Sequence, residues 1–281
     1  MAPSRREKMR IWHQSFTDLT KFPRYRNTLE EHAAKVSAAD MSIAIHGLIP
    51  GTYPPGIAPM EVNSHAGLRS LNARQVCEAA LAAQKNGYDA FALGCFFDPG
   101  LQEARSLVDI PVLSLTESTM LTACSLGRRF ALISLTSFQK MLTEELAAQY
   151  GLSSRLAGVI AMSPSVSLHD LEREGDAVQA IKAGFMQACS QALDLGAEII
   201  IPGDGVLNAF LVRHRLLNLD GAPVMDALGV LFHHAAFFVR ARRSECLDIS
   251  RRLLYAQPTA AMLAHARAFY GALDRGESEF S

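Results

Sequence analysis

Two residues that follow predicted strands could carry acid/base or nucleophilic chemistry. Cys95 stands in the turn Gly-Cys-Phe-Phe-Asp-Pro-Gly at residues 94–100, and Asp204 stands between two glycines. A thiol can act as a nucleophile or as an acid, and a carboxylate can hold a proton or activate a water molecule. A thiol paired with a carboxylate therefore suits asymmetric chemistry on a small molecule.

The segments that end at Cys95 and Asp204 repeat one pattern. Residues 87–95 contain a glycine, an apolar strand and a second glycine, and residues 196–204 repeat this order 109 positions later. A repeat of this length indicates duplication of a whole half of the chain, because solenoid units run to about 20–50 residues. In parallel sheets, ligands bind beyond the carboxyl ends of the strands. We therefore expect Cys95 and Asp204 to meet across one cleft.

Alternating strands and helices must position these two residues. Short apolar runs bounded by turn residues predict the strands, and longer stretches between them predict the helices, so the order is βαβα and the class is α/β with parallel sheets. The predicted strands are 10–12, 41–45, 89–93, 112–115, 130–134, 156–162, 198–201 and 224–225, and the predicted helices are 71–85, 101–107, 119–126, 139–150, 177–195 and 229–242.

The composition excludes several classes of protein. The 281 residues include 27 Lys plus Arg against 28 Asp plus Glu, so the net charge of −1 offers no basic surplus for nucleic acid or a membrane surface. The amino-terminal segment 1–10 is polar and no apolar run is long enough to span a membrane, so we expect a cytoplasmic protein. Five cysteines without a Cys-x-x-Cys pair argue against disulfides and against a metal site.

The chain resembles the aspartate/glutamate/hydantoin racemase superfamily, and most closely its hydantoin racemase branch, over most of residues 9–242. The resemblance is carried by Gly-Cys-Phe-Phe-Asp-Pro-Gly-Leu at 94–101, Asp-Ile-Pro-Val at 109–112, Glu117, Leu-Gly-Arg-Arg-Phe-Ala-Leu-Ile at 126–133 and Tyr-Gly-Leu at 150–152. It implies two Rossmann-like lobes related by a pseudo-twofold axis, an active site in the cleft between them, and no cofactor. We assign residues 1–118 and 228–281 to the first lobe and residues 119–227 to the second.

The resemblance also implies one catalytic cysteine on each lobe, acting on opposite faces of a carbon atom. Cys95 is the first of these, and alignment of the two half-repeats puts Asp204 at the second position. A carboxylate is a much weaker base than a thiolate unless burial raises its pKa. This chain therefore departs from the family pattern at one of the two catalytic positions.

Three reaction classes remain open for a small-molecule substrate. We place first a hydrolytic attack at the C2 atom of a hydantoin-type ring, for example desulfurisation of a thiohydantoin, with Asp204 activating water and Cys95 attacking or protonating the leaving atom. The alternative is a hydantoin or amino-acid racemase or isomerase with Cys95 and Asp204 as its acid/base groups. A decarboxylase or a non-catalytic small-ligand binding protein is the further alternative.

Other strand exits supply candidates for substrate binding. Hydroxyl, amide and ring groups follow the first strand, and hydroxyls follow the strand at 130–134, where helix N-capping is an equal interpretation. Aromatic residues beside Cys95 could form an apolar wall. The candidates are His13, Gln14, Ser15, Phe96, Phe97, Glu117, Thr136, Ser137 and Asn208. An apolar stripe within 260–273 must bury against something, and we expect a homo-oligomer.

Overall fold

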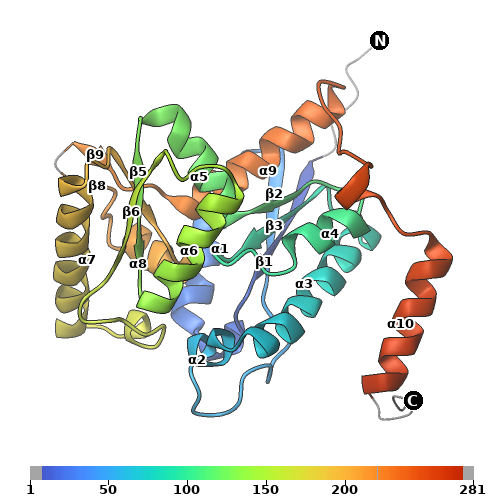
Figure 1. Ribbon diagram of the computed structural model, residues 1–281, viewed down its shortest axis with the longest axis horizontal. Coiled ribbons are helices and arrows are strands. Elements are labelled where there is room, and N and C mark those ends of the chain that lie inside the picture. Colours follow the sequence, from blue (N-terminus) through green and yellow to red (C-terminus); the bar gives the residue numbers. More distant parts are fainter. Residues whose placement is uncertain (1–7, 220, 275–281) are drawn as a thin grey trace.

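The computed structural model describes residues 8–219 and 221–274. Strands and helices alternate along most of the chain, and Figure 1 shows their arrangement. The strands are β1 (Met9–Ser15), β2 (Met41–His46), β3 (Ala90–Gly94), β4 (Val112–Ser114), β5 (Phe130–Ser134), β6 (Leu156–Ala161), β7 (Ile199–Pro202), β8 (Asn218–Leu219) and β9 (Ala222–Pro223). The α-helices are α1 (Pro23–Val36), α2 (Pro59–Ser64), α3 (Ala66–Lys85), α4 (Leu101–Leu107), α5 (Leu115–Leu126), α6 (Ser137–Gln149), α7 (Asp176–Asp194), α8 (Gly205–Arg213), α9 (Ala227–Arg243) and α10 (Ala260–Asp274).

Two parallel sheets share one strand order. The first sheet runs β2-β1-β3-β4 and the second runs β6-β5-β7, with every pairing parallel. An isolated parallel bridge between Ile200 and Val224 places a fourth segment beside β7, where β4 lies beside β3 in the first sheet. The predicted α/β class with two similar lobes is confirmed.

The central strands are apolar because helices cover both faces of each sheet. All residues of β3, β5 and β7 are buried, as is typical of parallel strands. Helix α9 returns from the second half of the chain to pack on β1, β3 and β4. This packing supports the proposed division into 1–118 with 228–281 and 119–227, which stays a proposal.

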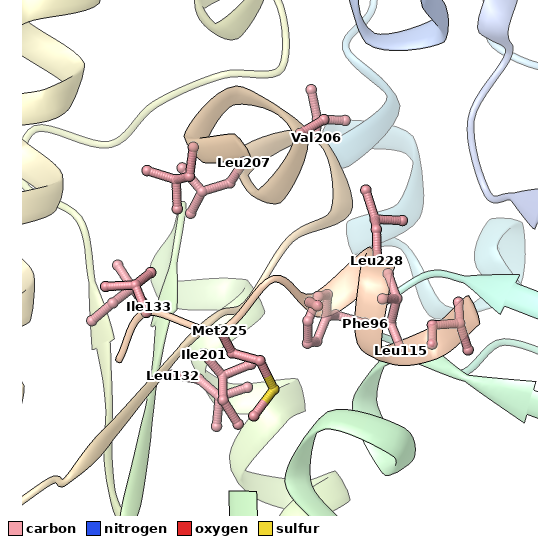
Figure 2. Close-up of a cluster of buried hydrophobic side chains, with 14 of the residues drawn as sticks. Phe96, Leu115, Leu132, Ile133, Ile201, Val206, Leu207, Met225 and Leu228 are labelled. Carbon is pink, nitrogen blue, oxygen red and sulfur yellow. The ribbon is translucent and has the colours of Figure 1, made fainter. Parts of the chain in front are cut away.

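An apolar core joins the two halves. Figure 2 shows side chains from the turn after β3, from α5 and α9, from β5 and β7, and from α8 meeting in one cluster. The labelled members are Phe96, Leu115, Leu132, Ile133, Ile201, Val206, Leu207, Met225 and Leu228. Because residues beside both Cys95 and Asp204 belong to this cluster, packing holds the two strand exits together.

Helix α10 lies away from the two sheets, on the side of α3 (Figure 1). An ion pair of 2.5 Å between Arg267 and Glu78 joins it to α3. Its apolar residues Met262 and Phe269 are 63% and 49% exposed, so the expected burial of this stripe does not occur within the chain. The homo-oligomer stays a prediction.

No helix in the described part of the chain is long and apolar enough to cross a membrane. The cytoplasmic location stays a prediction.

Three helices near the cleft, α1, α2 and α8, were not expected from the sequence. Helix α1 buries Tyr25, Leu29 and Ala33 at helical spacing, but the polar residues between them keep its overall hydrophobicity low. Helix α8 is buried on nearly every side, so its sequence shows no amphipathic period. Helices α1 and α8 are stabilised mainly by their tertiary contacts.

Candidate active site

Cys95 and Asp204 occupy equivalent positions in the two sheets. Cys95 directly follows β3, is only 8% exposed, and accepts a hydrogen bond on Sγ from the backbone N–H of Phe97. Asp204 follows β7 by one residue and is the N-cap of α8. The carboxylate accepts hydrogen bonds on Oδ1 from the N–H groups of Val206 (2.7 Å) and Leu207 (3.1 Å).

The second carboxylate oxygen of Asp204 accepts a hydrogen bond from helix α6. Gln139 in α6 donates from Nε2 to Oδ2 at 3.0 Å, while its own Oε1 accepts from the N–H of Leu135 at 2.7 Å. Gln139 is completely buried. The Asp204 carboxylate is thus fixed in orientation, and Oδ2 retains a lone pair that can accept a proton.

One pocket contains both groups. The turns that carry them touch, since a Cβ placed on Gly205 would lie 3.3 Å from the carbonyl oxygen of Gly94. The pocket is narrow, with a cavity volume of about 40 Å³. Its lining is Ser15, Phe16, Thr17, Tyr25, Pro59, Met60, Asn63, Gly94, Cys95, Phe96, Phe97, Leu168, Asp204, Gly205 and Val206. The predicted meeting of Cys95 and Asp204 across one cleft agrees with this lining.

Burial controls the protonation of the pair. Burial raises the pKa of the Cys95 thiol, with further raising by the charges of Asp98 and Asp204, and only the Phe97 N–H and Arg69 oppose it. Burial also raises the pKa of Asp204, against the three hydrogen bonds that favour its charged form. Helix α4 begins only at Leu101, so its N-terminus does not lie at the thiol to oppose this rise.

Three of the predicted substrate-binding residues line the pocket. Ser15 is the last residue of β1, and its backbone pairs with Gly94 beside the Cys95 thiol. Phe96 and Phe97 form part of the wall next to Cys95, and Phe97 also contacts Phe138 of the second half at a ring distance of 6.4 Å. These three residues are brought together with Cys95 and Asp204.

The structure places three other candidates of the first half outside this pocket. The ring of His13 packs beneath Gly94 and against Phe232 of α9, because β1 has not yet reached the sheet edge at that residue. Gln14 is buried. Its Nε2 donates a hydrogen bond to the Ser15 carbonyl oxygen, and its Oε1 accepts one from the Trp12 ring N–H. Glu117 forms an ion pair with Arg105.

The three candidates of the second half also lie outside this pocket. Thr136 is the N-cap of α6 and lines a neighbouring pocket with Met60 and Leu168. Ser137 is exposed at the first position of that helix. Asn208 is fully buried, and its side-chain oxygen accepts the N–H of Leu228 at 2.9 Å.

Sequence reasoning missed the residues that close the pocket from other elements. Tyr25 comes from α1, Met60 and Asn63 from α2, and Leu168 from the segment before α7. The apolar spacing of Tyr25, Leu29 and Ala33 would have revealed α1, but no local signal shows that its first turn reaches the cleft.

The described residues do not form a candidate metal site. No group of three or more His, Cys, Asp or Glu residues within 8–219 and 221–274 could hold a metal ion.

Fold and site together define a two-lobed α/β protein with a thiol and a carboxylate facing one interlobe pocket. The family model described as Asp/Glu/Hydantoin racemase matches residues 24–235. The chain therefore belongs to the Asp/Glu/hydantoin racemase family.

Similar proteins agree with this assignment. The chain is 28% identical over 206 residues to a hydantoin racemase of Pseudomonas sp. (strain NS671), covering 72% of this chain and 77% of that protein. It is 25% identical over 191 residues to a hydantoin racemase of Paenarthrobacter aurescens, covering 68% and 78%. Among solved structures, the allantoin racemase from Klebsiella pneumoniae superimposes with a TM-score of 0.70 at 23% identity, covering 90% of this chain and 94% of that chain, and supports the fold.

Proposed function

We propose that this protein is an isomerase that inverts the stereocentre of a hydantoin-type ring, using Asp204 and Cys95 as its two acid/base groups. One observation carries the proposal: a thiol and a carboxylate from equivalent strand exits line the same pocket. The hydantoin racemases among its relatives favour this reaction over hydrolysis at C2, which the sequence alone ranked first.

The protonation states define a balanced reaction. In one state Asp204 is a carboxylate and Cys95 a thiol; Asp204 removes the proton from the ring carbon, and Cys95 delivers its own proton to the opposite face. The products are a protonated Asp204 and a Cys95 thiolate, which together invert the other enantiomer in reverse. Burial raises the pKa of the Cys95 thiol, whereas three hydrogen bonds favour the charged form of Asp204, so the first state is favoured at rest. The two directions therefore start from different forms of the protein.

The test follows a chiral 5-substituted hydantoin by optical rotation and by deuterium uptake from D₂O. The wild-type chain should catalyse both, and Asp204→Asn, which retains helix-capping ability, should lower the rate by about 10²–10⁴-fold because it removes one base. Asp204→Cys should retain activity, since it replaces one acid/base group with another. Cys246→Ser is the control, because Cys246 is exposed and outside the pocket. Loss of optical rotation without deuterium uptake would contradict the mechanism.

The asymmetry of the pair supports a second candidate, hydrolysis at ring C2. Asp204 would activate water, Cys95 would protonate the departing atom, and a 2-thiohydantoin would yield the hydantoin and hydrogen sulfide. Sulfide release from the 2-thio analogue, with no change of rotation for the hydantoin, would favour this candidate. Binding without turnover of either compound would favour a ligand-binding protein.

A further inference from the structure

The phenol of Tyr25 lies at the junction of the two catalytic turns. A Cβ placed on Gly205 would lie 3.2 Å from the Tyr25 hydroxyl oxygen and 3.3 Å from the carbonyl oxygen of Gly94. Tyr25 is 2% exposed and lines the same pocket as Cys95 and Asp204. Its hydroxyl interacts electrostatically with both of those groups, since the charge of each raises the pKa of Tyr25 further after burial.

The hydrogen of this phenol is available to a ligand. Within residues 8–219 and 221–274, the phenol oxygen has one hydrogen-bond partner, Ser15, whose Oγ donates to it over a long 3.4 Å. Ser15 therefore occupies an acceptor site of the phenol and leaves the phenol O–H to point elsewhere. A buried Tyr O–H normally finds an acceptor, and Tyr25 lines the pocket.

The second half of the protein holds Tyr25 in place through its backbone. The N-cap residue of α1, Phe22, makes no side-chain cap. Instead, Glu172 reaches from the segment before α7 and accepts the N–H of Tyr25 at 2.8 Å and the N–H of Arg24 at 2.9 Å. The phenol is thus positioned before any ligand binds, which is the requirement for an effective oxyanion donor.

Proton removal from a ring carbon beside a carbonyl moves negative charge onto the carbonyl oxygen. With Asp204 and Cys95 on opposite faces of the ring, a third group must meet that oxygen at the ring edge. We propose that Tyr25 is a catalytic residue that donates a hydrogen bond to this oxygen, with Ser15 and Glu172 as its positioning residues. This inference rests on the proposed function and identifies its substrate as a ring with a carbonyl beside the reacting carbon.

Tyr25→Phe in the full chain tests the inference, with Tyr88→Phe as the matched control because Tyr88 lies outside the pocket. We expect Tyr25→Phe to lower kcat by about 10²–10³-fold, as removal of one oxyanion donor does, with a much smaller change in KM and an unchanged melting temperature. A merely structural tyrosine would instead lower the melting temperature and leave kcat intact. Wild-type kcat in Tyr25→Phe would overturn the assignment while leaving the isomerase proposal standing.

A binding measurement separates the two proposals. 5-Methylidenehydantoin is planar at the reacting carbon and carries the ring carbonyls, and calorimetry should give at least a tenfold weaker Kd for Tyr25→Phe than for the wild type or Tyr88→Phe. If the wild type binds this probe through Tyr25 but inverts no hydantoin, the isomerase proposal fails and the donor assignment stands. If the wild type neither binds nor turns over, both fail.

A second variant covers the case in which Tyr25→Phe does not fold. Gly205→Ala places a methyl group 3.2 Å from the phenol oxygen and must displace it slightly. We expect this variant to keep the phenol but to show a lower kcat. If a folded Gly205→Ala variant shows wild-type kinetics and binds the probe as the wild type does, the assignment is overturned.

Discussion

Cys95 and Asp204 lie in different environments, which set how tightly each group holds a proton. The thiol has lost most of its solvent and has one hydrogen bond that favours the thiolate, whereas the carboxylate accepts three. Burial therefore keeps Cys95 protonated while hydrogen bonds oppose protonation of Asp204. Both effects separate the pKa values of the two groups, so the shared proton rests on the thiol.

This asymmetry predicts how fast Cys95 reacts relative to Cys246. Because burial and the Asp204 charge raise the pKa of Cys95, iodoacetamide should modify Cys95 more slowly than the exposed Cys246 at neutral pH. Asp204→Asn should raise the rate of modification of Cys95 by up to about tenfold, because it removes one nearby negative charge. The rate of modification of Cys246 should stay constant. Mass spectrometry of each cysteine peptide measures both rates. Faster modification of Cys95 than of Cys246 in the wild type would refute this account.

At the scale of elements, α1 depends on the other half of the chain for its first turn. Its N-terminal N–H groups have no local cap, and the Glu172 carboxylate supplies two acceptors from 147 residues or more away in sequence. A carboxylate at a helix N-terminus is also favoured by the helix dipole. The start of α1, and with it Tyr25, is therefore fixed by a contact between the halves.

We expect Glu172→Ala to lower the free energy of unfolding by about 1–2 kcal/mol, because it leaves two helix N–H groups without their partner. Glu174→Ala is the matched control. Glu174 is 70% exposed and pairs with the exposed Arg24, so its loss should change stability by less than about 0.5 kcal/mol. Urea denaturation measures both variants. Equal effects would show that the cap contributes nothing.

At the scale of the molecule, a polar contact as well as the apolar core joins the halves beside the thiol. Tyr150 at the end of α6 donates its hydroxyl to Asp98, and Thr116 donates to the other carboxylate oxygen at 2.9 Å. Burial raises the pKa of Asp98 from 3.8 to about 6, with Glu117 adding to the rise and the hydrogen bonds from Tyr150, Thr116 and Ser114 opposing it. The contact is therefore sensitive to pH.

The sign of the effect follows from linkage. The folded chain holds the Asp98 proton more tightly than the unfolded chain, so this residue's contribution to stability is present below pH 3.8 and is lost as the pH rises to about 6. Asp98→Asn does not titrate and keeps an acceptor for Tyr150. The stability of the wild type relative to Asp98→Asn should fall by about 1–3 kcal/mol across this interval. Parallel pH profiles from urea denaturation of the two proteins would contradict the shift.

The sequence by itself determined the α/β class, the seven strands of the two parallel sheets and the two strand exits that carry Cys95 and Asp204, whereas the predicted strand 224–225 forms only an isolated bridge at Val224. These features depend on local signals: apolar runs, turn glycines and a repeat that brings the same pattern to both halves. Ser15, Phe96 and Phe97 were predictable as pocket residues because they adjoin those exits.

Only the tertiary structure decided which other residues reach the pocket. His13 lies two residues before Ser15 on the same strand, yet it packs under Gly94, because only the end of the strand opens onto the cleft. Tyr25 and Asn63 enter the pocket on helices whose positions depend on contacts between distant segments. A local pattern specifies the period and the end of an element, whereas the partner of each side chain depends on how the two halves pack.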